Sequence, residues 1–549
     1  MSISVSKLQE RPPALYYLQN FKSALCWLLE RYRDLLSDAE HAFIEEFTAL
    51  PWSSQALLVR LIMRRARHFR ATKIRYPEID SVERAVGPLV GLQWIDPRPL
   101  LEVADLFRLA RRAEIAEIFP EAPRSMSKCD LLELLKDSHP EARCFEEWRG
   151  SVAERVYFVA IAPICTQLRL LFFGNFRQDW SEFVLADLGI FKYETVGFST
   201  DSRAFQSRKD IEDFFALYEC RRRLYEESPL TAVLEHIPKM RLDHEWLESR
   251  RDKLIFQIAR EFERSGEREK ALSLYSRCSH PGARLRAVRT LETSGRPADA
   301  YHMAVEAAAQ PESAAEAQRL ARIVARLERR LKLARSERSR PARPERLDLI
   351  VPAPAAGCSV EQAALEHLAG VAAPVYYVEN ALINSLFGLL CWDAIFAPVS
   401  GAFFHPFHVG PADLFSATYQ ARRSRQFDEC LARLHSDEYR ISILDRYRTK
   451  QGTQSPFVYW GLLDEGLLNT ALACIPAAHL RAYFGRLLSN LRENRSGLPD
   501  LVQFWPAEAR YRMIEVKGPG DRLQDNQQRW MQFCLERAIP VTVCHVRWV

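Results

Sequence analysis

Apolar residues recur at three- and four-residue intervals along much of the N-terminal half of the chain. The pattern is clearest in residues 15–36, 38–50 and 53–69, and it returns in residues 211–228. This spacing is typical of amphipathic helices, so we expect a mostly helical N-terminal region. In residues 154–176, β-branched and aromatic residues mix with leucines, and the periodicity does not distinguish a buried helix from a strand there.

A short helix is predicted in "SMSKCDLLELLKDS", residues 125–138. Ser127 is a candidate N-cap, because a serine side chain can accept a hydrogen bond from a free backbone N–H of the first turn. The approach to this helix is polar and partly basic, and it includes Lys128.

The middle of the chain nearly repeats itself. "REFERSGEREKALSLYSRC" is echoed by "RTLETSGRPADAYHMAVEA", which aligns Gly266 with Gly295 and Ala271 with Ala300. A small residue on one helix that faces a turn on another is typical of stacked helical hairpins. Ordinary helical hairpins are the alternative, since only two copies are visible.

Two strands are predicted near the C-terminus, beyond residues 327–357, whose Arg- and Pro-rich sequence we interpret as a domain linker. "DLVQFW" and "RYRMIEVK" are rich in aromatic and β-branched residues, and Pro506 ends the first. If they form a symmetric hairpin, Asp500 lies opposite Glu515 and both carboxylates share one face. Alternation along the second strand adds Lys517 to that face.

Two carboxylates and an amine on one face are costly, because like charges a few Å apart repel and raise each other's pKa. A divalent cation removes that cost, and carboxylate oxygens suit Mg²⁺ or Mn²⁺. Such an ion polarises a phosphate and acidifies a bound water, while Lys517, which we expect to be exposed, orients that water or stabilises developing charge. The pattern therefore predicts phosphodiester cleavage. The alternative is a surface hairpin with a screened ion pair.

The residues around these three side chains are more specific than the pattern itself. Through "GLPDL", "EVKGPGDRL" and the Gln and Trp beyond them, the C-terminal region resembles the VRR-NUC branch of the PD-(D/E)XK nuclease superfamily, and within it the Fanconi-associated nuclease family. The similarity extends to "LFGLLCWDAIF", "YYLQNF" and "LLVRLIMRR", so it covers most of the chain. It implies mainly α-helical N-terminal and middle regions, SAP-like and TPR-like, followed by an α/β restriction-endonuclease-like nuclease domain.

The resemblance also implies roles for single residues. Asp500 and Glu515 match the metal-binding acids, Lys517 matches the catalytic lysine, and Val516 matches a position whose backbone carbonyl is a metal ligand. Gln527 matches a glutamine on the following helix.

A further metal-binding glutamate is expected on the helix that opens the nuclease domain. "SVEQAALEHL" makes Glu361 the candidate, with Glu366 and Glu379 as alternatives. The expected regions are a helical DNA-binding region (1–80), a SAP-like helical DNA-binding domain (81–230), a TPR-like domain with linker (231–345) and a VRR-NUC nuclease domain (346–549).

Composition limits where the protein acts and what it binds. The chain is 48% hydrophobic and 27% charged, with a net charge of +5, and no apolar run approaches the roughly 20 residues of a membrane span. We expect a cytoplasmic, nucleoid-associated protein of the bacterial type. The twelve cysteines contain no CxxC pair, and the sequence departs from animal family members in lacking an N-terminal ubiquitin-binding zinc finger.

Basic residues are densest between positions 60 and 75. A helix this basic suits a phosphate backbone, although a solvated, ion-paired face is the alternative. The candidate DNA-binding residues are Arg60, Arg64, Arg65, Arg67, Arg70, Lys73 and, from the SAP-like segment, Lys128.

We therefore expect a metal-dependent DNA nuclease. The resemblance implies that it is structure-specific, that it cuts 5′ flaps and branched DNA with 5′-to-3′ exonuclease activity, and that it acts in interstrand crosslink repair. The alternatives are a junction resolvase or restriction-like endonuclease, and a non-catalytic DNA-binding scaffold. The long helical N-terminal half disfavours a minimal resolvase, and the intact Asp, Glu and Lys disfavour a scaffold.

Overall fold

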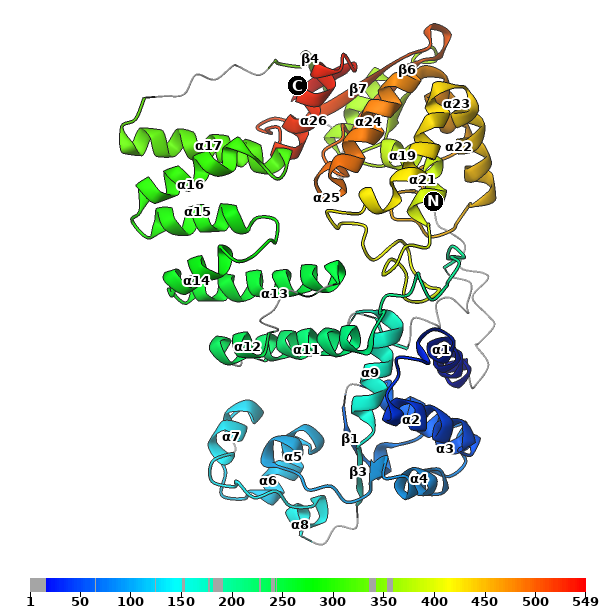
Figure 1. Cartoon of the computed structure of the whole chain (residues 1–549), viewed down its shortest axis with the longest axis vertical. Coiled ribbons are helices and arrows are strands. Elements are labelled where there is room, and N and C mark those ends of the chain that lie inside the picture. The colour runs from blue at the N-terminus through cyan, green and yellow to red at the C-terminus, as the bar shows by residue number, and fades with distance from the viewer. Residues whose placement is uncertain are drawn as a thin grey trace. The chain divides into compact units, whose positions relative to one another are not determined.

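The chain folds into two compact units, Met1–Lys192 and Tyr193–Val549, and each is described by itself. Helices dominate both units in the computed structural model (Figure 1). The structure describes residues 16–64, 66–123, 125–150, 154–175, 178–180, 191–226, 229–237, 242, 244–334, 342–352 and 359–549.

The first unit places helices around a small antiparallel sheet. Its strands β1 (His68–Arg70), β2 (Ile95–Asp96) and β3 (Val156–Val159) pair in the order β1-β3-β2. The helices are α1 (Tyr16–Tyr32), α2 (Asp38–Ala49), α3 (Trp52–Ile62), the 3-10 turn η1 (Ala71–Lys73), α4 (Val82–Gly91), α5 (Val103–Leu109), α6 (Arg112–Ile118), α7 (Lys128–Leu135), α8 (Phe145–Arg149) and α9 (Ala162–Phe173).

These elements confirm a mainly helical N-terminal region. The helix predicted over residues 53–69 is too long, however, because α3 ends at Ile62 and β1 begins at His68, so most of the basic segment 60–75 is not helical. The side chain of Ser127 caps α7 as predicted, since its hydroxyl accepts a 3.2 Å hydrogen bond from the backbone N–H of Asp130. The ambiguous residues 154–176 contain both structures, because β3 is followed by α9.

The second unit begins with a succession of helices that stack in Figure 1. Gly266 and Gly295 follow the C-termini of α13 and α15, and both adopt positive φ angles, +87° and +75°, which glycine reaches without strain. Ala271 and Ala300 are fully buried on the next helices, so the repeat does form helical hairpins. The helices are α11 (Arg208–Tyr225), α12 (Leu230–His236), α13 (Glu245–Arg264), α14 (Arg268–Tyr275), α15 (Ala283–Thr293), α16 (Pro297–Ala309) and α17 (Ala314–Leu331).

A five-stranded mixed sheet forms the centre of the C-terminal region, with strand order β4-β8-β7-β6-β5. β8 pairs in parallel with both β4 and β7, whereas β6 pairs antiparallel with both β7 and β5. The strands are β4 (Glu345–Val351), β5 (Val375–Tyr377), β6 (Leu501–Trp505), β7 (Arg510–Lys517) and β8 (Val541–Trp548).

β4 corrects the interpretation of residues 327–357 as a linker. Within this segment, Leu347, Leu349 and Val351 occupy alternate positions, and Leu349 and Val351 are buried in the core beneath the sheet. The backbone of β4 pairs with β8, and the sequence of residues 327–357 alone gives no sign of this partner. Alternation was therefore a better guide here than the Arg and Pro content around it.

Apolar cores cover both faces of the sheet. Val502 and Met513 belong to the larger, helix-rich core, whereas Leu501, Ile514 and Val516 belong to the smaller one. The remaining elements are α18 (Val360–Leu368), α19 (Leu382–Leu390), α20 (Trp392–Ile395), η2 (Ala421–Arg423), α21 (Ser424–Ala432), η3 (Arg433–His435), α22 (Glu438–Thr449), α23 (Glu465–Cys474), α24 (Ala477–Ser489), α25 (Leu491–Asn494), η4 (Pro506–Glu508) and α26 (Asp525–Glu536).

Candidate active site

Strands β6 and β7 form the hairpin that the sequence predicted. Their register pairs Leu501 with Ile514, and η4 closes the turn. One position further along the same register, Asp500 lies opposite Glu515. Because residues directly opposite in an antiparallel pair share a face, the two carboxylates lie on the same side of the sheet.

Backbone groups of two neighbouring strands hold Asp500 in place. A carboxylate oxygen, Oδ2, accepts a 2.8 Å hydrogen bond from the backbone N–H of Val516. The backbone carbonyl of Asp500 accepts another 2.8 Å bond from the N–H of Val378, directly after β5. The side chain is therefore oriented toward β7 by the fold itself.

The three proposed catalytic side chains are buried. Asp500 is 6%, Glu515 0% and Lys517 8% exposed, so the expectation of an exposed Lys517 is wrong. The reason is that a helix-rich layer covers this face of the sheet, and most of that layer, from α19 to α24, is distant in sequence from β7. The ammonium nitrogen of Lys517 lies 2.7 Å from Glu515 Oε1, which is an ion-pair distance.

Burial and neighbouring negative charge raise the pKa of both carboxyl groups. Desolvation raises the pKa of Asp500 to about 6, opposed by its hydrogen bond from Val516. Desolvation and then the charge of Asp500 raise the pKa of Glu515 to about 8, although Lys517 acts in the opposite direction. The single positive charge of Lys517 does not compensate two ionised acids, so ionising both would leave an excess of buried negative charge that a cation would offset.

Two of the three candidate glutamates lie close to this pair. Glu361, in the first turn of α18, and Glu379, in the turn after β5 rather than on a helix, both add negative charge that raises the pKa of Asp500. Glu379 also acts on Glu515. Glu366 is exposed, and it accepts a 2.8 Å hydrogen bond from the side chain of Gln362 on the same helix. The structure therefore brings Glu361 and Glu379 toward the pair, and the choice between them stays a prediction.

Tyr377 is a residue of this site that the sequence did not single out. Its hydroxyl donates a 2.5 Å hydrogen bond to Glu379, and its ring is 43% exposed at the end of β5. That bond and the nearby charges of Asp500 and Glu361 raise the pKa of the phenol. Tyr377 pairs with Leu501, the residue after Asp500. The sequence did not predict this pairing of β5 with β6, and so it gave no reason to place Tyr377 at the site.

The chemistry of these groups fits a hard divalent cation. Among the described residues, neither carboxylate oxygen of Glu515 receives a well-aligned hydrogen bond, although both are fully buried. Oxygen-rich, negatively charged sites of this kind suit Mg²⁺ or Mn²⁺. No group of three or more His, Cys, Asp or Glu side chains in the described part of the chain is already placed to hold a metal ion. A third carboxylate would therefore have to swing toward Asp500 and Glu515.

The loop that leads into Asp500 packs tightly against the helix that follows Lys517. Gly497 has a φ angle of +89°, and a Cβ atom there would lie 2.8 to 2.9 Å from atoms of Asn526, so only glycine fits. The indole N–H of Trp530 donates a 3.2 Å hydrogen bond to the carbonyl of Ser496. Gln527 caps the same helix, since its side-chain oxygen accepts a 2.8 Å bond from the N–H of Gln524.

Among the candidate DNA-binding residues, two arginines have partners within the first unit. Arg70 pairs with Glu114 at 2.7 Å and also with Glu154, and its side chain is only 10% exposed. Arg60 pairs with Glu78 at 2.6 Å and lies over the ring of Tyr17. These contacts give both arginines a structural role in addition to their predicted role in DNA binding.

The other candidates are more accessible. Arg64, Arg67 and Lys73 are exposed in the segment that follows α3. Lys128 is exposed at the start of α7, where its amine donates a 2.9 Å hydrogen bond to the carbonyl of Ala110. Arg65 lies outside the described residues.

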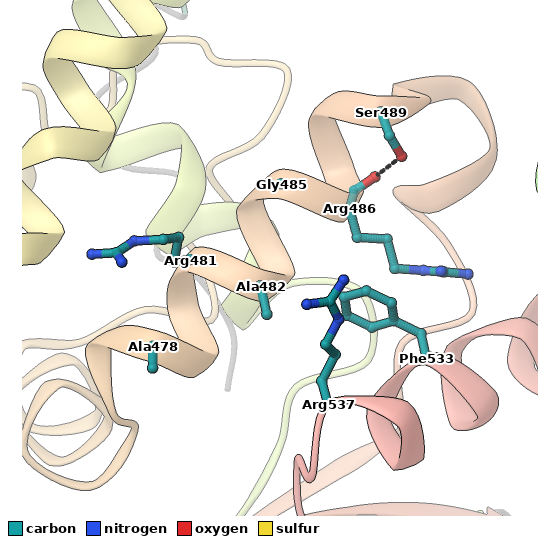
Figure 2. A pocket seen from close by; sticks show the side chains of 8 residues that line it. All are labelled: Ala478, Arg481, Ala482, Gly485, Arg486, Ser489, Phe533 and Arg537. Carbon is teal, nitrogen blue, oxygen red and sulfur yellow. Dashed lines mark hydrogen bonds between the residues drawn. The ribbon is translucent and has the colours of Figure 1, made fainter.

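A second basic surface, which the sequence did not reveal, lies on α24 and α26. Arg481, Arg486 and Arg537 line a hollow of about 460 Å³ together with Phe533, and no carboxylate lines it. Figure 2 shows Arg537 and Arg486 near the Phe533 ring, with guanidinium carbons 5.9 and 4.6 Å from the ring centre. Burial lowers the pKa of Arg486, which indicates that its charge is poorly compensated.

Comparison with known families identifies three regions of the chain. Residues 435–548, which include the β6–β7 hairpin, match the family described as VRR-NUC domain. Residues 15–96 match the FAN1 HTH domain, and residues 100–148 match the Fanconi anemia-associated nuclease SAP domain. The C-terminal region is therefore a nuclease domain of a class that is generally dependent on divalent metal ions.

Whole-chain comparison identifies the family. A Fanconi-associated nuclease 1 homolog of Pseudomonas aeruginosa is 53% identical over 98% of this chain and 96% of its own length. The homolog of Arabidopsis thaliana is 25% identical over 98% of this chain and 68% of its own. The chain belongs to the Fanconi-associated nuclease family, and it is a DNA nuclease.

Two solved structures share the fold. The crystal structure of paFAN1 bound to 2nt 5′ flap DNA with gap has a TM-score of 0.90 and 52% identity, over 98% of this chain and 99% of the other. The complex with 1nt 5′ flap DNA has a TM-score of 0.89 and 53% identity, over 98% and 100%. No helix among the described residues is both long and apolar enough to cross a membrane.

Proposed function

We propose that this protein cuts branched DNA at 5′ flaps, close to the junction, with Mg²⁺ or Mn²⁺ as its cofactor. The observation that carries the proposal is the buried pair of Asp500 and Glu515. Both have raised pKa values, and the buried oxygens of Glu515 receive no well-aligned hydrogen bond from the described residues, which favours a bound cation. The flap preference rests on the family and on the 5′ flap DNA bound by its structural relatives.

Each residue of the site has a distinct proposed role. Asp500, Glu515 and the carbonyl of Val516 would hold the cation, with Glu361 or Glu379 as a further ligand. A cation held there would supply a Lewis acid for the scissile phosphate and a more acidic water. Lys517, next to Glu515, would donate a hydrogen bond to the attacking water or to the charge that develops on the phosphate.

Two exposed basic surfaces would contact phosphate groups. The first consists of Arg64, Arg67 and Lys73 in the first unit. The second is the arginine hollow on α24 and α26, where replacing Arg481 and Arg537 together by Gln should weaken DNA binding. Unchanged affinity and salt dependence would remove the hollow from the DNA interface.

The same proposal includes 5′-to-3′ exonuclease activity, a role in interstrand crosslink repair and action on chromosomal DNA. It also includes the division of the chain into four regions at residues 1–80, 81–230, 231–345 and 346–549. All of these follow from the family rather than from the geometry. The exonuclease would appear as a ladder of shortened products that grows from the 5′ end of the cut strand.

Cleavage of end-labelled DNA tests the proposed function. Wild type and Asp500→Ala are compared on 5′-flap, 3′-flap, four-way-junction and single-stranded DNA, with Mg²⁺, Mn²⁺ or chelator. The proposal expects metal-dependent cuts near the 5′-flap junction that the variant loses. Preference for the four-way junction would instead indicate a resolvase, and no cutting of any substrate would contradict a catalytic role.

A further inference from the structure

Helix α17, the last of the helical succession, contacts the chain segment that leads into the catalytic hairpin. Its N-cap residue Ser313 donates a hydrogen bond of 2.9 Å to Glu493 Oε1. The backbone N–H of Ala315 donates a 3.3 Å bond to the other oxygen of Glu493. Glu493 lies in α25, a short distance before Asp500, and it accepts from groups of the first turn of α17 that need an acceptor.

The same helix also contacts the segment that leads out of the hairpin. Arg322 forms a two-pronged ion pair with Asp525, the first residue of α26, with both N–O distances at 2.7 Å. One turn earlier on α17, Gln318 accepts a 2.7 Å hydrogen bond from Arg529. Residues four apart lie on one face of a helix, so a single face of α17 meets a single face of α26.

The two contacted segments also touch each other. The first turn of α26 packs against Gly497 with no space for a Cβ atom, and Trp530 donates a hydrogen bond to the carbonyl of Ser496. A shift of α26 would therefore move the chain that carries Asp500 as well as the loop that follows Lys517.

We propose that Arg322 is a positioning residue for the nuclease reaction. Through Asp525 it fixes the first turn of α26, and through that turn it fixes the segments on both sides of the catalytic hairpin. This inference rests on the proposed catalytic roles of Asp500 and Lys517, and it makes the helical succession part of the machinery that aligns them.

Because the ion pair of Arg322 and Asp525 is exposed, its effect on catalysis can be measured apart from its effect on stability. The side chains of Arg322 and Asp525 are 51% and 42% exposed, and ion pairs this exposed contribute little to the free energy of unfolding. Small displacements of catalytic groups are far more costly for turnover, on the order of 100-fold for about 1 Å. Loss of the pair should therefore appear in kcat, with little change in melting temperature or in DNA affinity.

A charge-swap cycle tests the proposal. Arg322→Asp and Asp525→Arg are measured singly and together, for kcat and KM on the substrate that the wild type cuts best. Each single variant should lower kcat by about 10-fold or more, with KM within about twofold, and the double variant should restore kcat to within about threefold of wild type. Single variants that keep wild-type kcat, or a double variant that restores nothing, would overturn the proposal.

The chain offers a matched control on the same helix. Arg326 forms a comparable two-pronged pair with Glu292, at 3.0 and 2.7 Å, and Glu292 lies on α15 rather than on α26. Arg326→Asp should therefore leave kcat unchanged. A kcat loss equal to that of Arg322→Asp would show that any disturbance of α17 suffices, and would overturn the specific role of Arg322.

Hydrogen exchange provides a readout that does not depend on activity. The amides of residues 518–528 should exchange faster in Arg322→Asp and regain protection in the double variant, with no change in Arg326→Asp. Unchanged exchange in Arg322→Asp would overturn the inference even if the protein cuts 5′ flaps. Conversely, failure to cut 5′ flaps would contradict the proposed function while leaving the exchange result valid.

Discussion

A carboxylate oxygen of Asp500 accepts a 2.8 Å hydrogen bond from the backbone N–H of Val516, the residue that follows Glu515. The side chain thus continues the β6–β7 ladder by one step beyond Leu501 and Ile514. Backbone hydrogen bonding therefore holds the two carboxyl groups on one face despite their mutual repulsion. The fold imposes a cluster of negative charge that a divalent cation would relieve.

Glu515→Gln should stabilise the metal-free protein at pH 8 and weaken its pH dependence, leaving the smaller part that the raised pKa of Asp500 contributes. Burial and Asp500 raise the pKa of Glu515 from its ordinary 4.5 to about 8. The folded state therefore binds more protons than the unfolded state between these values, so stability falls as pH rises from about 4.5 to 8. We expect a loss on the order of a few kcal/mol in wild type, measured by urea unfolding in chelator.

An exposed glutamate is the control for this measurement. Glu366→Gln, on α18, should unfold with the same pH dependence as wild type. If Glu515→Gln also did so, Glu515 would not be held in a raised-pKa environment. Saturating Mg²⁺ or Mn²⁺ should restore stability at pH 8 in wild type but not in Glu515→Gln.

Lys517→Met should lower kcat by at least about 100-fold, because it removes the only amine beside Glu515 among the described residues. DNA affinity should change little, since the amine is buried. Lys450→Met is the matched control, because Lys450 also forms a 2.7 Å ion pair, with Glu194. It should cost some stability but leave kcat intact, and a kcat retained in Lys517→Met would remove Lys517 from the reaction.

Gly497→Ala should destabilise the nuclease domain by about 1–3 kcal/mol, because alanine is strained at a positive φ angle and its Cβ would collide with Asn526. Gly485→Ala, on α24, is the control. A Cβ there meets nothing within 4 Å, so the substitution should stabilise the helix by about 0.5–1 kcal/mol. Thermal unfolding of both variants measures the difference, and equal melting temperatures would show that the Gly497 turn is not tightly packed.

Replacing Arg64, Arg67 and Lys73 by Ala should weaken DNA binding and flatten its salt dependence, by about one unit of slope for each phosphate group that is no longer neutralised. Arg70→Ala should behave differently, because Arg70 lowers the pKa of Glu114 to about 2 and pairs with it in a largely buried site. Breaking such a pair costs about 3 kcal/mol of stability. Binding titrations at several salt concentrations, alongside urea unfolding, separate the two effects, and an unchanged slope in the triple variant would exclude that surface.

The sequence pattern predicts the structure correctly where the residues that determine an element lie close together in the sequence. The β6–β7 hairpin is one such case, since the proline-containing turn between the strands sets the register that places Asp500 opposite Glu515. The Ser-Gly turns of the helical hairpins are another, because Gly266 and Gly295 end their helices by local backbone geometry.

Pattern fails where partners come from distant parts of the chain. Lys517 is buried rather than exposed because most of the layer that covers this face of the sheet comes from helices α19 to α24, which are far from β7 in the sequence. Arg70 resembles its basic neighbours in sequence, yet its partners Glu114 and Glu154 are 44 and 84 residues away. β4 resembles a linker because its partner β8 is the last strand of the chain.

Direct measurement of Mn²⁺ binding tests the central claim, that Asp500 and Glu515 form the metal site. Calorimetric titrations at pH 7, in buffers of different ionisation enthalpy, report both affinity and proton release. Wild type should bind Mn²⁺ and release protons, because a carboxyl group with a pKa of about 8 must ionise to become a ligand. Glu515→Gln should lose most of that binding and proton release, and binding that is unchanged in Glu515→Gln would contradict the account.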